Sequence, residues 1–120
     1  MAKKTKSKTY LLLFRGGADP ADMTPEQMKT TMNNWMSWMG QLKKNKQLTL
    51  GHPLEDGGKI LSGIKGKNVA AFEDDKDTVG GFLVIDAKNM ADATRIAKGC
   101  PIFNNGGSVE LREAAEMPEM

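Results

Sequence analysis

The sequence has one cysteine and one histidine in 120 residues, and only 6% of its residues are aromatic. A single cysteine excludes an internal disulfide and is typical of a reducing compartment, so we predict a cytoplasmic protein. Zinc sites take three or four His, Cys or carboxylate ligands, and neither His52 nor Cys100 has companions at ligand spacing. We therefore predict no metal site, and we interpret Cys100 as a buried structural thiol.

Long apolar runs are also missing. The run Tyr10–Phe14 is far shorter than the roughly 20 residues that cross a bilayer, and no signal-peptide pattern precedes it, so we predict no membrane partner. The formal net charge of +2, from 17 basic and 15 acidic residues, indicates no particular partner. We predict one domain over residues 9–113, a basic flexible N-terminus at 1–8 that does not bind nucleic acid, and a loose tail at 114–120.

Local signals predict two helices. Thr24-Pro25-Glu26-Gln27 combines a capping threonine, an early proline and capping-box spacing, and begins a helix that runs to about Lys44. Its apolar residues fall on one side and are expected to pack on a sheet. They are Met28, Met32, Trp35, Met36, Trp38, Met39 and Leu42. A second helix is predicted over Asn89–Lys98, with Gly99 in a left-handed position at its end.

The remaining segments predict strands. Apolar or alternating patterns mark strands at Thr9–Arg15, Val79–Ile85 and Ser108–Arg112, the last one after a reversal at Asn104–Gly107. Two further strands, Leu48–Glu55 and Lys59–Ile64, flank Asp56-Gly57-Gly58, a sequence typical of hairpin turns, so we expect them to pair with each other. Apart from the patch Val69–Phe72, residues 65–77 are polar and irregular.

The order strand–helix–hairpin–strand–helix–strand indicates an α+β fold. We predict a ferredoxin-like antiparallel sheet with two helices on one face and an inserted hairpin. Such a sheet leaves its other face without a cover. We therefore expect a homodimer in which the open sheet faces of two copies pack together.

Four segments together resemble the YCII-related family, in its DGPF-domain branch. They are Tyr10–Gly16; the helix with Trp35–Gly40; Gly51–Leu54 with Gly58-Lys59; and Gly80–Phe82 followed by Gly99–Pro101 and Gly106–Glu110. The resemblance implies a dimeric α+β barrel and an intracellular bacterial protein. Some relatives in the wider superfamily are enzymes, and a His/Asp pair is proposed as catalytic in part of the family.

The chain departs from this branch at its signature. Counting back from Gly80-Gly81 places the Asp-Gly-Pro-Phe sequence over Val69-Ala70-Ala71-Phe72, where only Phe72 matches. Valine at the aspartate position neither accepts a proton nor orients a histidine. A function that depends on this aspartate is therefore not expected here.

The candidate site residues are His52, Arg15, Trp35 and Asp56. His52 is either a general base, oriented by Glu55 or Asp56, or a polar strand residue. Arg15 either holds a substrate anion in bidentate geometry or pairs with a nearby acid. Trp35 and the methionines either line a ligand pocket or pack the helix on the sheet. The glycine pairs lack the spacing of a phosphate-binding loop, so we predict no cofactor.

Two functions remain open. In the first, a dimeric protein binds a small organic or anionic molecule without catalysis, which the altered signature favours. In the second, the protein is an enzyme with a lyase, isomerase or dehydrochlorinase-like activity, with His52 as general base and Arg15 as anion clamp. A third interpretation is a purely structural or interaction role.

Overall fold

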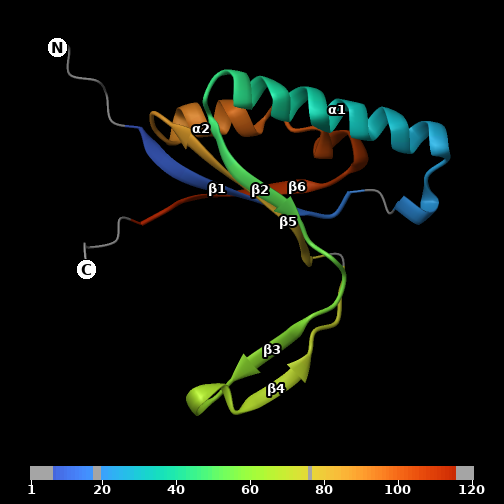
Figure 1. Cartoon of the computed structure of the whole chain (residues 1–120), viewed down its shortest axis with the longest axis vertical. Coiled ribbons are helices and arrows are strands. Elements are labelled where there is room, and N and C mark those ends of the chain that lie inside the picture. Colours follow the sequence, from blue (N-terminus) through green and yellow to red (C-terminus); the bar gives the residue numbers. More distant parts are fainter. Residues whose placement is uncertain (1–6, 18–19, 76, 116–120) are drawn as a thin grey trace.

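The computed structural model describes residues 7–17, 20–75 and 77–115. The described chain forms strands, two α-helices and short 3₁₀ turns (Figure 1). The strands are β1 (Lys8–Arg15), β2 (Leu48–Pro53), β3 (Lys59–Ser62), β4 (Asn68–Ala71), β5 (Val79–Ala87) and β6 (Ser108–Glu113). The helices are α1 (Pro25–Lys44) and α2 (Met90–Ala97), and the 3₁₀ turns are η1 (Pro20–Asp22), η2 (Ile64–Gly66) and η3 (Pro101–Asn105). The predicted N-terminal segment and C-terminal tail lie mostly outside these residues.

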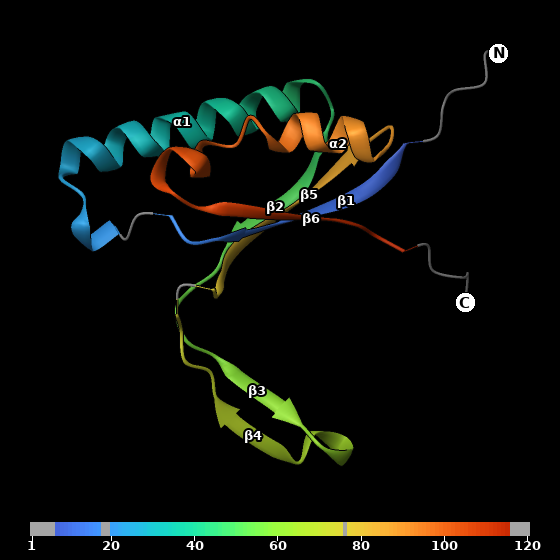
Figure 2. The same cartoon turned by 180° about the vertical axis from the view of Figure 1, so that it is seen from behind.

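The main sheet has the strand order β2-β5-β1-β6, and all of its neighbouring strands are antiparallel. Leu12 in the central strand β1 lies opposite Leu83 on one side and Leu111 on the other. Both helices cover the same face of this sheet (Figures 1 and 2). The predicted ferredoxin-like α+β fold is confirmed. None of the described helices is long and apolar enough to cross a membrane.

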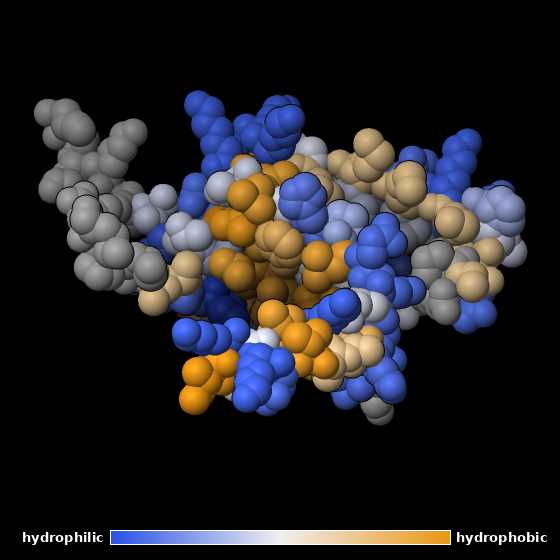
Figure 3. Space-filling view, turned by 60° about the horizontal axis from the view of Figure 1, so that its bottom comes forward, coloured by the Kyte–Doolittle hydropathy of each residue, from blue (hydrophilic) through white to orange (hydrophobic). Residues whose placement is uncertain are grey.

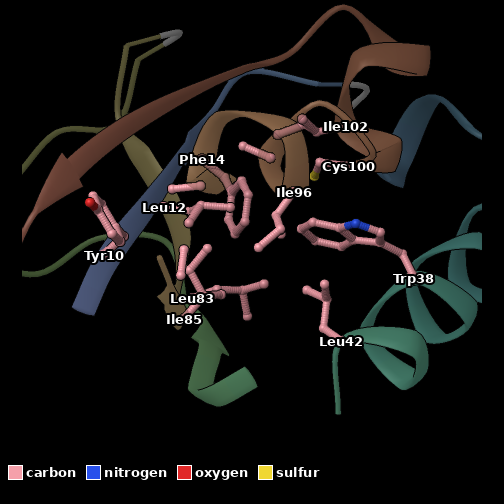
Figure 4. Close-up of a cluster of buried hydrophobic side chains, with 13 residues drawn as sticks. Tyr10, Leu12, Phe14, Trp38, Leu42, Leu83, Ile85, Ile96, Cys100 and Ile102 are labelled. Atoms are coloured by element: carbon pink, nitrogen blue, oxygen red, sulfur yellow. The ribbon is translucent and has the colours of Figure 1, made fainter. Parts of the chain in front are cut away.

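The core lies between this sheet and the helices. Alternate side chains of β1 point into it, which matches the period of two of a strand with one buried face. Tyr10, Leu12 and Ile85 are fully buried, and α1 contributes Trp38 and Leu42 (Figure 4). From α2 and the turn after it come Ala93, Ile96, Ala97, Cys100 and Ile102.

Helix α1 begins at its predicted cap. The Thr24 hydroxyl accepts a hydrogen bond from the Gln27 amide at 3.1 Å, and the Gln27 side chain accepts one from the Thr24 amide at 2.9 Å. The expectation that the whole apolar stripe packs on the sheet is wrong for Met32 and Met36. Met32 and Met36 are 60% and 67% exposed, whereas Trp38 and Leu42 are buried. Met32 lines a pocket below the first half of the helix, whereas Met36 is exposed outside this pocket.

The predicted hairpin is placed wrongly. β2 pairs with β5, and β3 pairs instead with β4, so that Leu61 lies opposite Val69. Asp56-Gly57-Gly58 is the connection to this second hairpin, and the true reversal lies at residues 63–67, where Gly63, Lys65 and Gly66 all have positive φ. The local turn signal did not decide the pairing, because the apolar strand β5 offers β2 a partner within the main sheet.

The end of α2 differs from prediction in one respect. Gly99 does not have a positive φ; its lack of a side chain matters because a Cβ there would lie 3.1 Å from Nε1 of Trp38. The left-handed residue is Gly106, with φ of 80°, which ends η3 and leads into β6. The reversal predicted over Asn104–Gly107 is therefore present, after a 3₁₀ turn.

The face of the sheet away from the helices carries a second set of apolar side chains. By the alternation and register of the strands these are Leu11 and Leu13 of β1, Phe82 and Val84 of β5, and Leu50 of β2. Charged side chains of β1 and β6 border them. Figure 3 brings this side forward and shows hydrophobic side chains gathered on it. We call this surface the open face.

Candidate functional site

An apolar pocket of about 520 Å³ lies between the N-terminal half of α1 and the end of the sheet where β2 stops and β5 starts. Two strand glycines, Gly51 and Gly81, line it. A Cβ at Gly51 would collide with the Leu83 side chain and lie 2.8 Å from the Phe82 carbonyl oxygen, and one at Gly81 would lie 3.2 Å from the His52 carbonyl oxygen. Only glycine therefore allows the strands to approach this closely.

Helix α1 forms the other wall. Met28, Met32, Trp35 and Met39 recur at the spacing of one helical face and all line the pocket. The Trp35 ring stands edge-on to Phe14, with ring centroids 5.2 Å apart, and edge-on to Trp38 at 5.8 Å. These contacts hold the indole in place, while the methionines supply flexible, polarisable surface.

His52 borders the pocket through strand β2, but the register of β2 with β5 places its side chain on the open face, beside Phe82. It is exposed on β2 opposite Phe82, and the two rings are 6.2 Å apart. Among the described residues lining the pocket it is the only one with an ionisable side chain. Within the part of the chain that the structure describes, no hydrogen bond or ion pair orients its imidazole.

Arg15 also lies on the open face of the sheet, on β1. Its Nη1 is 2.5 Å from Oε1 of Glu110, and its Nε donates to the Asp77 carbonyl oxygen at 3.0 Å. Arg112 contacts the second oxygen of Glu110 at 3.1 Å. The hydrogen bond from Arg15, and then that from Arg112, lower the pKa of Glu110 below its ordinary value. We predicted that Arg15 either binds a substrate anion or pairs with a nearby acid, and in the structure it forms an ion pair with Glu110.

The four predicted site residues do not come together. Trp35 and His52 both line the apolar pocket, whereas Arg15 and Asp56 do not. Asp56 is exposed in the connection between β2 and β3. Residues 69–72, the altered signature, lie in β4 and just after it and also do not line the pocket. The sequence analysis did not predict that Gly51 and Gly81 form a wall of the pocket. A glycine within a strand often marks a place where another chain segment or a ligand approaches closely, and this could have indicated them.

A second, polar hollow of about 620 Å³ adjoins this pocket at the start of α1. The two share Met23, Thr31 and Asn105. The other side chains of the hollow are mostly carboxylates, amides and hydroxyls. They are Asp22, Glu26, Gln27, Thr30, Asn34, Pro101 and Asn104. A ligand in the apolar pocket therefore has room for a polar substituent on this side.

Neither metal nor thiol chemistry is indicated. The described residues contain no group of three or more His, Cys, Asp or Glu placed to hold a metal ion. Cys100 is buried, as predicted, and desolvation raises the pKa of its thiol to about 11. At neutral pH it is therefore protonated and a poor nucleophile.

A ferredoxin-like sheet with two helices on one face and a pocket beneath α1 defines a small α+β protein. The sequence profile of the YCII-related domain matches residues 9–118, and the chain belongs to this family, as predicted. Among solved structures, it is similar to 5-chloro-2-hydroxyhydroquinone dehydrochlorinase from Burkholderia phenoliruptrix AC1100 in complex with 2,5-dihydroxybenzoquinone. That similarity has a TM-score of 0.48 and 16% identity, over 91% of this chain and 95% of that chain. Among curated proteins, none matches this sequence.

Proposed function

We propose that this protein is a homodimer that binds a small, ring-bearing organic molecule in the pocket beneath α1, without catalysing a reaction. The main support for this proposal is the wall of the pocket, where Phe14, Trp35 and methionines surround a volume of about 520 Å³. Ligand pockets of proteins are typically about 300–1,000 Å³, mostly apolar, with a few polar groups that orient the ligand. The polar hollow beyond Thr31 provides such groups.

The charge distribution favours an uncharged ligand over a carboxylate. Arg15, the candidate anion clamp, is paired with Glu110 on the open face and does not line the pocket. The described lining has no lysine or arginine, and a carboxylate buried without a partner is strongly disfavoured.

The same geometry argues against general base catalysis by His52. A catalytic histidine is usually held by a hydrogen bond from its second nitrogen to a carboxylate or carbonyl. No group of the described chain holds His52 in this way, and the resemblance to the family signature implies Val69 in place of its aspartate. The enzyme alternative keeps one supporting observation, that His52 borders the pocket that would hold the substrate, although its side chain lies on the open face beside Phe82.

Dimerisation is supported by the open face. Leu11, Leu13 and Val84 form an apolar surface on a sheet that nothing in the described chain covers. Apolar patches of this kind mark interaction surfaces, and isologous pairing of one patch with itself is the commonest arrangement in homo-oligomers.

Ligand binding is tested with matched aromatic probes. We expect calorimetric titration to detect binding of an uncharged probe such as 2-phenylethanol or indole, and much weaker binding of phenylacetate. Met32→Ala should weaken binding several-fold because Met32 lines the pocket, whereas Met36→Ala, an equally exposed position on the same helix outside the pocket, should not. Equal effects of the two variants, or preference for phenylacetate, would contradict the proposal.

Catalysis and dimerisation have separate tests. His52→Ala should leave the fold intact and change binding only modestly; an enzymatic turnover that this variant abolishes would favour the alternative. For the dimer, sedimentation at micromolar concentration should give twice the monomer mass. Leu13→Asp on the open face should dissociate it, and Met36→Asp on the helix layer should not.

A further inference from the structure

The β3–β4 hairpin, residues 59–71, stands apart from the rest of the molecule, and we call it the arm. Figures 1 and 2 show from two opposite sides that it projects away from the main sheet. Every residue of both strands is exposed. Its base is held by hydrogen bonds from the Phe72 amide to the Gly58 carbonyl oxygen at 2.9 Å and from the Gly57 amide to Asp74 at 2.6 Å.

The arm is unusually apolar for an isolated hairpin. Ile60, Leu61, Ile64 and Val69 are 51%, 62%, 84% and 56% exposed. Leu61 and Val69 lie directly opposite each other and share one face with Ala71, whereas Ile60 points to the other face beside Ala70. A two-stranded hairpin is at best marginally stable in water unless it packs against something. Leu61 and Val69 are exposed in the described chain, so both are available to pack against a further surface.

The position of the arm indicates what this surface is. The arm projects on the side of the main sheet opposite the helices, which is the side of the open face (Figures 1 and 2). A second copy packed on the open face occupies the space beside the arm. By two-fold symmetry, the second copy's arm then lies beside the first copy. The arm thus extends the apolar surface that the sheet already offers to the same neighbour.

We propose that in the homodimer each arm packs against the body of the second subunit through its Leu61–Val69 face. This inference rests on the proposed dimer and deepens it, because it assigns part of the interface to a segment outside the sheet. A β-hairpin that crosses to a neighbour adds contact area without changing the open face itself. Removal of the arm should then weaken the dimer but leave each subunit folded.

The base of the arm allows a precise deletion. The carbonyl oxygen of Gly58 already accepts a hydrogen bond from the Phe72 amide. If only two residues joined Gly58 to Phe72, this same bond would close a four-residue β-turn. Replacing residues 59–71 by Asn-Gly should close this turn. In sedimentation experiments over a concentration series, we expect the dissociation constant of the dimer to rise at least tenfold, with an unchanged circular dichroism spectrum. An unchanged dissociation constant would overturn the proposal.

Point variants identify the contact face. Leu61→Ser with Val69→Ser should weaken the dimer as the deletion does, whereas Ile60→Ser, on the opposite face, should have a much smaller effect. If only Ile60→Ser weakens the dimer, the assigned face is wrong. Since these changes leave the backbone of the arm in place, they also exclude an effect of the new turn.

Hydrogen exchange gives an independent measurement on the unaltered chain. Amides of residues 59–71 should exchange at least tenfold more slowly at concentrations where the protein is a dimer than where it is a monomer. Equal exchange would mean that the arm stays free, or packs on its own subunit or another molecule, and would overturn the proposal. A dimer that Leu13→Asp dissociates but arm removal does not affect would refute this inference alone. A parent chain that is monomeric at all concentrations would refute the proposed dimer as well.

Discussion

The indole of Trp35 stands edge-on to the ring of Phe14, with the ring planes at 89° and the centroids 5.2 Å apart. This contact joins α1 to the central strand at the floor of the pocket. Beside this contact, Met28 and Met32 of α1 line the pocket together with the strand glycines Gly51 and Gly81. The pocket is therefore bounded by this aromatic contact on one side and by two strand glycines on another.

The aromatic contact should be measurable as a coupling energy. Edge-to-face aromatic pairs contribute about 0.5–1.5 kcal/mol beyond the burial of their surface. We expect a double-mutant cycle of Phe14→Leu and Trp35→Leu, measured by urea unfolding, to give a coupling in this range. The control cycle of Phe14→Leu with Met36→Ala should be additive, because Met36 is an exposed residue outside the pocket lining. Additivity in both cycles would mean that the rings are independent.

The glycines of the sheet should differ sharply in their tolerance of alanine. At Gly51 a Cβ would collide with Leu83 and lie 2.8 Å from the Phe82 carbonyl oxygen, whereas at Gly80 it would meet nothing within 4 Å. We expect Gly51→Ala to lower the free energy of unfolding by about 2 kcal/mol or more, as overpacking does. Gly80→Ala should be neutral or slightly stabilising. Chemical denaturation of the two variants makes the comparison, and equal losses would contradict the close approach of β2 to β5.

Local sequence patterns predicted correctly those features that depend only on residues close together in the chain. The cap at Thr24 and the alternation of Val109 and Glu110 in β6 depend on near neighbours, and both are present as predicted. The pairing of β2 was not predictable in this way. Asp56-Gly57-Gly58 suits a hairpin, and only the competing, distant strand β5 decides otherwise.

The site was less accessible from sequence than the fold. Whether Met32 packs on the sheet or lines a cavity depends on the separation of α1 and the strands, which Trp35 and Gly51 set together. The ion pair of Arg15 with Glu110 depends on the register of β1 with β6, which no local pattern contains. Charge and residue type therefore suggested candidates, and only the tertiary structure separated those at the pocket from those on the open face.

Cys100 should be unreactive in the folded protein. Burial raises the pKa of its thiol to about 11, so the thiolate that reacts with alkylating reagents is scarce at neutral pH and also shielded. We expect iodoacetamide to modify the folded chain at least tenfold more slowly than the chain in denaturant. Because the sequence has one cysteine, mass spectrometry reports this site alone. Equal rates in both states would show that the thiol is accessible.

Glu110 should contribute stability that depends on pH. Hydrogen bonds from Arg15 and Arg112 lower its pKa in the folded state, so folding favours the ionised carboxylate. This contribution is fully present above the ordinary carboxyl pKa of the unfolded chain, and it is lost as the pH falls through the lowered pKa of the folded state. The parent should therefore be more stable than Glu110→Gln at neutral pH, and the difference should disappear in acid.

Since the side chains of Glu110, Arg15 and Arg112 are partly exposed, added salt should reduce this difference in stability at neutral pH. Urea unfolding of both proteins at several pH values makes the measurement, with Glu73→Gln, an exposed carboxylate without an ion pair among the described residues, as the control. A difference that persists in acid would show that the variant acts through packing and not through charge.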